Sequence, residues 1–245
     1  MFPNYVHSIV PTNDPGAWPV GPQGYCECDF AATANALNLL SRAPRYSKDL
    51  FVRESLFLFQ PRLGGTISPL KAWQIHQHGF GTHFGNLSHT DYETVLRDLV
   101  DRGIPTIVEL GVAFELGRVL IYGKHSVVLV GYSDLYQDAT GQVREEYYVV
   151  DSQWPLEGPF TLSSNDVDRD GDGVAETFPG NRTLERDEFR RLFRTGLYCP
   201  VFRTQQEHDA WYRQLRPVSR FPVIGWFNQM LFTGSYDVWC GETVS

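Results

Sequence analysis

The chain has 245 residues, of which 42% are hydrophobic and 20% charged, and its formal net charge is −8 at pH 7. This composition suits a chain that buries a full core and excludes a collagen-like or disordered class. The negative balance argues against a nucleic-acid partner, because proteins that bind a phosphate backbone concentrate positive charge, and the one basic cluster, "RDEFRRLFR", contains acids of its own.

The sequence also argues against a membrane protein and a disulfide scaffold. No apolar run reaches the roughly 18 residues that a membrane helix needs, and the start "MFPNYVHSIVPTNDPG" lacks the pattern of a signal peptide. We therefore expect a soluble protein. Its four cysteines are too few to hold a fold of this size together: Cys26, Cys28, Cys199 and Cys240.

In chain order, the first 27 residues are rich in proline and glycine and predict an extended arm. A helix is expected from Cys28 to residue 40, where small and apolar residues follow a mostly helical spacing. Further helices are expected near residues 48–60, 68–78, 91–103, 184–194 and 204–215. Runs rich in β-branched residues predict strands at 105–110, 118–123, 125–132, 145–152 and 196–202.

Helices come first and strands mostly later. That order predicts a single α+β domain over residues 1–245, with a helical half packed on an antiparallel sheet, and it disfavours alternating βαβ units. The aromatic and apolar tail at 221–245 is expected to pack on the body.

The stretch "PQGYCECDF" places two cysteines where a loop turns into a helix. A helix N-terminus favours the thiolate, which is the reactive form of cysteine, through its positive dipole end and unsatisfied N–H groups. Cys28 lies where the helical pattern begins, and Cys26 lies two residues back in the loop, so Cys28 is the predicted nucleophile. The alternative is that both are ordinary buried cysteines.

Two strands downstream supply partners for a thiol. "HSVVLVGY" and "EEYYVVDS" flank a polar segment that suits a hairpin loop, so His125 and Asp151 are expected to be cross-strand neighbours on one face. A carboxylate that orients an imidazole beside a nucleophile is the arrangement of nucleophilic catalysis. A purely structural His–Asp hydrogen bond is the alternative. Gln23, in the loop before Cys28, is a candidate to stabilise an oxyanion through its amide.

In combination and order, these segments resemble the papain-like cysteine peptidases. The branch most similar contains the double-glycine leader peptidases of bacteriocin export and their stand-alone bacterial relatives. The resemblance spans about residues 20–202, through "QGYCECDFAATANALNLL", "GGTISPLKAWQIHQHGFG", "YETVLRDLVDRGIPTIVEL", "HSVVLVGYSD" and "YYVVDSQWP". Relative to the family pattern, this chain has an insertion at about residues 163–180 and a C-terminal extension at residues 203–245.

The resemblance implies a papain-like fold and a thiol hydrolase that cleaves peptide or protein substrates without an organic cofactor. It implies Cys28 as nucleophile, His125 as general base and then acid, Asp151 as its orienting carboxylate and Gln23 as oxyanion donor. Trp154 resembles the indole that shields the His–acid hydrogen bond.

The sequence departs from the family pattern in two places. Asp29 and Phe30 replace the small residues that usually follow the nucleophile in the leader-peptidase branch, and the carboxylate of Asp29 is expected to raise the pKa of the neighbouring thiol. In classical papain relatives, a disulfide cysteine stands where Cys26 is found here. By that register Cys26 is structural, with Cys199 or Cys240 as its candidate partner.

"DVDRDGDGVAETF" carries oxygen ligands at alternate positions around a glycine turn, which is how a short loop wraps a hard cation. It predicts a structural Ca²⁺ site, and millimolar calcium outside cells would suit an exported protein. The predicted ligands are Asp168, Asp170, Asp172 and Glu176, with the carbonyl of Val174. The alternative is an acidic loop that only keeps the protein soluble.

Two other functions stay open. The same triad can hand an acyl group to an amine, as in an acyltransferase or a transglutaminase-like enzyme. A peptide-binding relative without turnover is the second, and Asp29 motivates it. His76 and His78 are disfavoured as a metal site, because residues two apart do not share a helix face.

Overall fold

The structure is a computed structural model and describes residues 2–10, 27–55, 70–87, 91–116, 119–153, 165–169 and 172–214. The helices are α1 (Cys28–Ser41), α2 (Lys48–Glu54), α3 (Leu70–Gln77), α4 (Tyr92–Asp101), α5 (Arg186–Leu192) and α6 (Gln205–Tyr212), with a 3₁₀ turn, η3 (Phe193–Thr195). The strands are β1 (Val6–Ser8), β2 (Gly81–Thr82), β3 (Gly85–Asn86), β4 (Thr106–Leu116), β5 (Val119–Ser133), β6 (Tyr136–Gln137), β7 (Val143–Arg144), β8 (Glu146–Val150), β9 (Asn165–Val167), β10 (Glu176–Phe178), β11 (Arg182–Glu185) and β12 (Leu197–Phe202).

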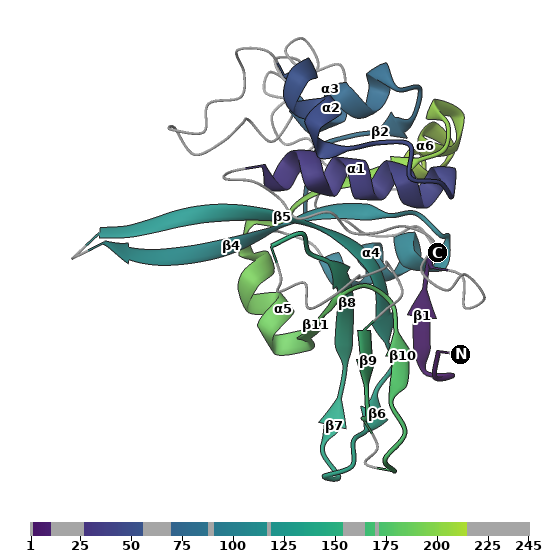
Figure 1. Cartoon of the computed structure of the whole chain (residues 1–245), viewed down its shortest axis with the longest axis vertical. Helices are drawn as coiled ribbons and strands as arrows, with labels where there is room; N and C mark the ends of the chain where they lie inside the picture. The colour runs from purple at the N-terminus through teal and green to yellow at the C-terminus, as the bar shows by residue number, and fades with distance from the viewer. Residues whose placement is uncertain are drawn as a thin grey trace.

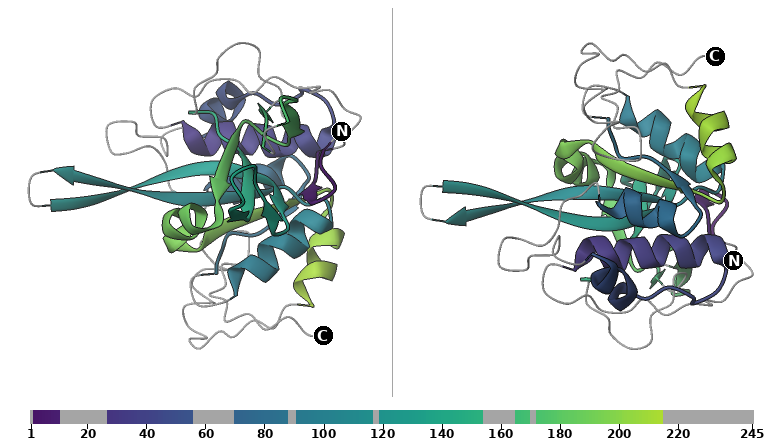
Figure 2. Two further views of the ribbon diagram at one scale, coloured as in Figure 1. Left: turned by 90° about the horizontal axis from the view of Figure 1, so that it is seen from below. Right: turned by 90° about the horizontal axis from the view of Figure 1, so that it is seen from above.

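The centre of the molecule is an antiparallel sheet with strand order β11-β8-β5-β4-β12-β2, to which β1 and β3 are added against β5 and β12. Helices α1, α2 and α3 lie on one side of this sheet, and α4 and α5 lie on the other (Figures 1 and 2). The architecture is therefore mixed helix and antiparallel sheet, and the expected α+β class is confirmed.

Both faces of the sheet are buried, which explains why its central strands have nearly continuous apolar sequences. Val128 and Val150 belong to the core cluster that includes α1, α2 and α3, whereas their chain neighbours Val127 and Val149 belong to the cluster that includes α4 and α5. Successive side chains of a strand point to opposite faces, so each strand contributes to both clusters.

Helix α1 is the central element of the first cluster. Its residues from Asp29 to Leu39 are all buried, and alanines make up much of this stretch. Alanine has the highest helix propensity and occupies little space, so the helix forms readily and packs closely on the sheet. This packing brings the N-terminus of α1, and with it Cys28, against strand β5.

Strands β4 and β5 form a long hairpin whose outer part extends away from the body (Figures 1 and 2). They pair continuously from Thr106↔Leu129 to Leu116↔Val119. The sequence predicted two shorter strands in place of β5, with a break before His125. Because β5 continues through that position, His125 lies within the strand, where the hairpin leaves the body.

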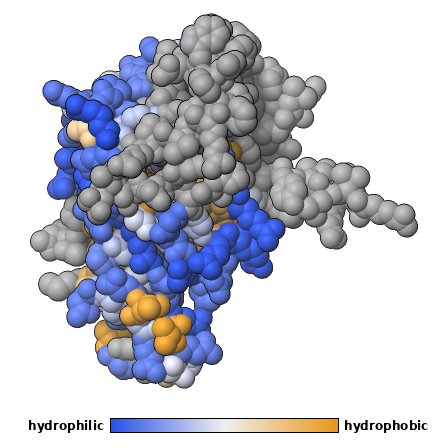
Figure 3. Space-filling model, turned by 180° about the vertical axis from the view of Figure 1, so that it is seen from behind, coloured by the Kyte–Doolittle hydropathy of each residue, from blue (hydrophilic) through white to orange (hydrophobic). Residues whose placement is uncertain are grey.

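A second projection is made by the ribbons β6–β7 and β9–β10, at the lower end of the molecule in Figure 1. Large apolar side chains are exposed there: Leu135, Val143 and Val174. Figure 3 shows hydrophobic surface at this end. The segment expected to be a polar hairpin loop, 133–144, thus contains a short ribbon of its own.

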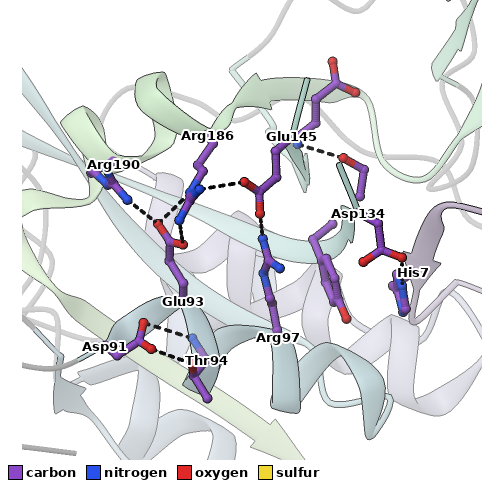
Figure 4. Close-up of polar contacts among 12 residues, drawn as sticks. His7, Asp91, Glu93, Thr94, Arg97, Asp134, Glu145, Arg186 and Arg190 are labelled. Atoms are coloured by element: carbon purple, nitrogen blue, oxygen red, sulfur yellow. Dashed lines mark hydrogen bonds and ion pairs between the residues drawn. The ribbon is translucent and has the colours of Figure 1, made fainter. Parts of the chain in front are cut away.

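The basic cluster of α5 is paired with acids of other elements (Figure 4). Glu93 of α4 accepts hydrogen bonds from Arg186, at 2.5 Å, and Arg190, at 3.0 Å. Glu145, just before β8, lies 2.8 Å from Arg186 and also binds Arg97. These ion pairs join α4, α5 and the sheet on the side opposite α1.

The C-terminal extension begins with α6, which packs on the edge of the sheet. Trp211 and His208 of this helix are buried, and His208 Nε2 lies 3.0 Å from Nδ1 of His83, which follows β2. Residues 215–245 lie outside the described residues. In the ranges that the structure describes, no helix is long and apolar enough to cross a membrane.

Candidate active site

Cys28 is the first residue of α1 and is partly exposed. The preceding residue, Glu27, does not cap the helix with its side chain, which instead binds Lys48 of α2 at 2.6 Å. The N–H groups and positive dipole end of a helix favour an anion at this position. The sulfur of Cys28 therefore lies at the positive end of the α1 dipole.

His125 links this thiol to a carboxylate. Its Nε2 lies 2.7 Å from Oδ1 of Asp151, which leaves Nδ1 as the ring nitrogen available to Cys28. Burial by itself would lower the pKa of His125, but hydrogen bonds with Asp151 and Cys28 and the charges of both raise that pKa to about 9. His125 therefore holds its proton at neutral pH.

The contact between His125 and Asp151 is diagonal, which corrects the expected register. Strands β5 and β8 pair at Val128↔Val150, and Asp151 is the first residue after β8. Continuing this register would place Asp151 opposite Val127, two residues from His125. Diagonal neighbours of an antiparallel pair share a face and lie within reach of long side chains, so the hydrogen bond still forms.

Asp151 is held by the turn that follows β10. Asn181 accepts a hydrogen bond from the Asp151 N–H at 2.8 Å and donates one to its carbonyl at 2.9 Å, and Arg182 donates to Oδ2 at 2.9 Å. Burial by itself would raise the pKa of Asp151, but the hydrogen bonds from His125, the Gln153 N–H and Arg182 lower that pKa to about 2. The acid is thus fixed in position and ionised.

Gly180 makes this turn possible. Its φ is +77°, and a Cβ built on it would lie 2.4 Å from the carbonyl oxygen of Val149. Only glycine adopts this backbone conformation at such close approach without strain. The glycine lets the chain pass directly over β8 and so delivers Asn181 to the backbone of Asp151.

Asp29, whose carboxylate follows the Cys28 thiol in the chain, is paired with a buried cation. Oδ1 of Asp29 lies 2.6 Å from Nζ of Lys71, on α3, and accepts a hydrogen bond from Ser126. Lys71 is 1% exposed and also contacts Glu109 at 2.7 Å. The carboxylate beside Cys28 therefore shares one buried ammonium group with a second carboxylate.

Of the two candidate disulfide partners of Cys26, Cys199 is excluded, and Cys240 lies outside the described residues. Cys199 is a free thiol, buried in the first core cluster, and its Sγ lies 3.1 Å from Oγ1 of Thr82. Burial raises the pKa of Cys199 to about 11, so it remains protonated and unreactive in the folded protein. Three other predicted site residues lie outside the described residues: Gln23, Cys26 and Trp154.

The predicted calcium loop is described in part. Asp168 and Asp172 fold back onto the chain, where they accept hydrogen bonds from the Gly173 N–H at 2.9 Å and the Val174 N–H at 2.7 Å. Glu176 begins β10, and Asp170 lies outside the described residues. Among the residues with described positions, no group of three or more His, Cys, Asp or Glu is arranged to hold a metal ion.

Sequence reasoning missed the residues that support the site, although some left a weak signal. Lys71 is a lone cation in the apolar stretch "LKAWQI", and a charge in such a context suggests a buried partner. Ser126 follows His125 in a predicted strand, which places it on the other face. Nothing in the sequence indicated that Asn181 and Arg182 would contact Asp151, apart from their turn-like context, "PGNR".

The chain was compared with known families and proteins. No family model matches it, and no curated protein matches it.

Proposed function

We propose that this protein is a thiol-dependent hydrolase with a papain-like fold, and that it cleaves peptide bonds through an acyl-enzyme on Cys28. One observation carries the proposal: the buried imidazole of His125 joins a helix-start thiol to an ionised carboxylate. The α+β architecture, with α1 packed on an antiparallel sheet, agrees with it. The resemblance of the sequence to papain-like peptidases supplies the reaction class.

The chemistry follows from the positions of the groups. Sγ of Cys28 attacks the substrate carbonyl carbon, and a tetrahedral oxyanion forms near the Cys28 backbone N–H at the start of α1. The C–N bond then breaks, and His125 gives its proton to the leaving amine. Water, activated by His125, hydrolyses the thioester and releases the acid and the free thiol. Asp151 keeps the imidazole oriented through both steps.

Gln23 is proposed as a second donor to the oxyanion, on the strength of the sequence resemblance alone. Its place in the reaction is tested by Gln23→Ala. We expect a decrease in kcat of about a hundredfold, because one oxyanion donor typically accounts for that much. Gln23→Glu is the matched variant, because it keeps the shape and removes the amide donor.

A peptidyl epoxide that alkylates thiol peptidases tests the assignment of the nucleophile. We expect intact-mass analysis to show one adduct on the native protein, located on Cys28 by peptide mapping. Cys28→Ala should abolish labelling, and Cys26→Ala, the matched control two residues away, should preserve it. Loss of labelling in Cys26→Ala alone would reverse the assignment.

Hydrolysis and acyl transfer are separated by their products. A peptide substrate is incubated with and without a primary amine acceptor, and the products are identified by mass spectrometry. Hydrolysis gives a free acid in both cases, whereas an acyltransferase gives an amide whose yield rises with the amine. A protein that binds peptides but yields neither product would be the inactive relative.

A structural calcium site at residues 168–176 is a separate proposal. It is supported by the alternating acids of the sequence and by the turn in which Asp168 and Asp172 already accept backbone hydrogen bonds. The loop is tied to the sheet through Arg169, whose Nη1 lies 2.5 Å from Oε1 of Glu146. A bound cation would stiffen this projection without taking part in catalysis.

A further inference from the structure

Four buried polar side chains meet beside Cys28 and His125, and each comes from a different element. They are Asp29 of α1, Lys71 of α3, Glu109 of β4 and Ser126 of β5, here called the buried charge cluster. Lys71 is at its centre. Its Nζ lies 2.6 Å from Asp29, 2.7 Å from Glu109 and 3.3 Å from Ser126.

The cluster is connected to the candidate site through the chain itself. Asp29 follows Cys28, Ser126 follows His125, and the Ser126 hydroxyl donates a hydrogen bond to the Asp29 carboxylate. Successive Cα atoms are held about 3.8 Å apart by covalent geometry. A hydrogen bond between the two following residues therefore limits how far the sulfur and the imidazole can separate.

Lys71 and Glu109 extend this restraint to a second strand. Glu109 is the cross-strand partner of Ser126, so one ammonium group holds α1 against both strands at the base of the hairpin. Beyond Glu109 and Ser126 the two strands stay paired to Leu116 and Val119, and Figure 2 shows the hairpin that they form projecting from the body. The cluster therefore lies where the pairing of β5 with β8 has ended and only its pairing with β4 continues.

Stability alone does not explain the cluster. Removing charges from water costs several kcal/mol per ion, and buried ion pairs can often be replaced by apolar residues without loss of stability. Such groups can instead select one arrangement among several packed alternatives. The arrangement selected here is the one that brings Cys28 and His125 together.

We propose that Asp29 and Ser126, held by Lys71, are positioning residues that set the distance between the Cys28 thiol and the His125 imidazole. The inference rests on the proposed function, because it assigns these residues to the same reaction. It predicts that their loss weakens the thiol–imidazole pair while the fold persists.

The test measures the rate at which iodoacetamide alkylates Cys28 as a function of pH, which requires no substrate. In the native protein, pairing with the imidazole should give a reactive plateau that extends down to about pH 5, where an isolated thiol barely reacts. In Ser126→Ala we expect this plateau to fall about tenfold, because a small displacement of a reacting group has an effect of this order. At about pH 10, where an unpaired thiol is also ionised, the alkylation rate of Cys28 in Ser126→Ala should stay within about twofold of the native rate.

Ser133→Ala is the matched control. Ser133 is on the same strand, is fully buried and accepts a hydrogen bond from the Glu146 N–H at 2.9 Å, far from the site along β5. Its loss should leave the Cys28 profile unchanged. Alkylation of Cys199 reports whether either variant has unfolded, because this thiol is buried in the folded protein.

A second pair of variants separates positioning from packing. Asp29→Asn keeps an acceptor for Ser126, and Asp29→Ala removes it. With a peptide substrate, Asp29→Ala should lower kcat about tenfold with KM nearly unchanged, and Asp29→Asn should recover part of that loss.

The outcomes distinguish the two proposals. If the native protein lacks the reactive plateau, the proposed function is wrong. If the native protein has the plateau and Ser126→Ala and Asp29→Ala keep it at the native level with Cys199 protected, the positioning role is overturned. An equal fall of the Cys28 plateau rate in Ser126→Ala and Ser133→Ala also contradicts the positioning role, because such a result would show only a general loss of packing.

Discussion

His125 Nε2 lies 2.7 Å from Oδ1 of Asp151, and the two residues come from strands whose regular pairing has ended before they meet. The hydrogen bond therefore joins diagonal positions just beyond the β5–β8 ladder, and the turn that follows β10 holds Asp151 in place for it. It sets the protonation state of the imidazole, because the same contact raises the pKa of His125 and lowers that of Asp151.

The raised pKa of His125 predicts the alkaline limit of activity. A His125 proton is needed for the leaving amine, and it is lost as pH rises through about 9. We expect kcat/KM to fall above that pH. Asp151→Asn should move this limit to lower pH and reduce kcat by about a hundredfold or more, since the imidazole loses its charged partner. A pH–rate profile of both proteins, with the His125 pKa from NMR, provides the measurement.

The same shifts predict how stability depends on pH. The folded pKa of His125 lies above its ordinary value of 6.5, so its contribution is complete below that pH and disappears as pH rises through about 9. The folded pKa of Asp151 lies below its ordinary value of 3.8, so its contribution is present above that pH and disappears as pH falls through about 2. Urea unfolding across this range, with His125→Gln as control, would contradict the assignment if both proteins lost stability equally near pH 9.

Asn181→Ala should reduce both stability and activity. It leaves the buried backbone N–H and carbonyl of Asp151 without their partner, which costs about 2 kcal/mol or more. Asn38 makes the same pair of hydrogen bonds with the backbone of Tyr46, at 2.8 and 2.9 Å. Asn38→Ala should therefore lose comparable stability and keep its kcat. Equal kcat values for the two variants would show that the turn does not support the site.

Lys71→Met should be severely destabilising. It leaves two buried carboxylates without their cation, and breaking such a pair costs about 3–5 kcal/mol. The triple variant Lys71→Met, Asp29→Asn, Glu109→Gln removes the uncompensated charge and should recover most of that loss. Lys48→Met, which breaks the more exposed pair with Glu27, should cost no more than about 1 kcal/mol. The urea midpoints of these variants, measured at an unchanged m-value, compare their free energies of unfolding.

Calcium should stabilise the protein if residues 168–176 bind it. A ligand at about a hundredfold excess over its Kd adds about 2.7 kcal/mol, which would appear as a higher Tm in Ca²⁺ than in EDTA. The double variant Asp168→Asn, Asp172→Asn should lose this response and keep kcat. Mg²⁺ is the comparison ion, because it needs a tighter octahedral site. The same Tm with and without Ca²⁺ would rule the site out.

The sequence by itself determined the class and the order of the main elements. The helical spacing that begins at Cys28 and the β-branched runs around His125 and before Asp151 are local patterns, and the structure follows them in element type. The bounds were predicted less accurately. β5 is one unbroken strand where two were expected, and β4 continues to Leu116, past its expected end at residue 110, because the two strands pair along their whole length.

Only the tertiary structure decided which buried polar groups meet. Ser126 binds Asp29 across 97 positions of the chain, and Lys71 binds Glu109 across 38. Periodicity records which face of an element is buried, but it does not record which neighbour that face will contact. A buried charge must find its partner wherever packing brings one, so the ion pair of Asp29 with Lys71 and the turn that fixes Asp151 are properties of the assembled fold.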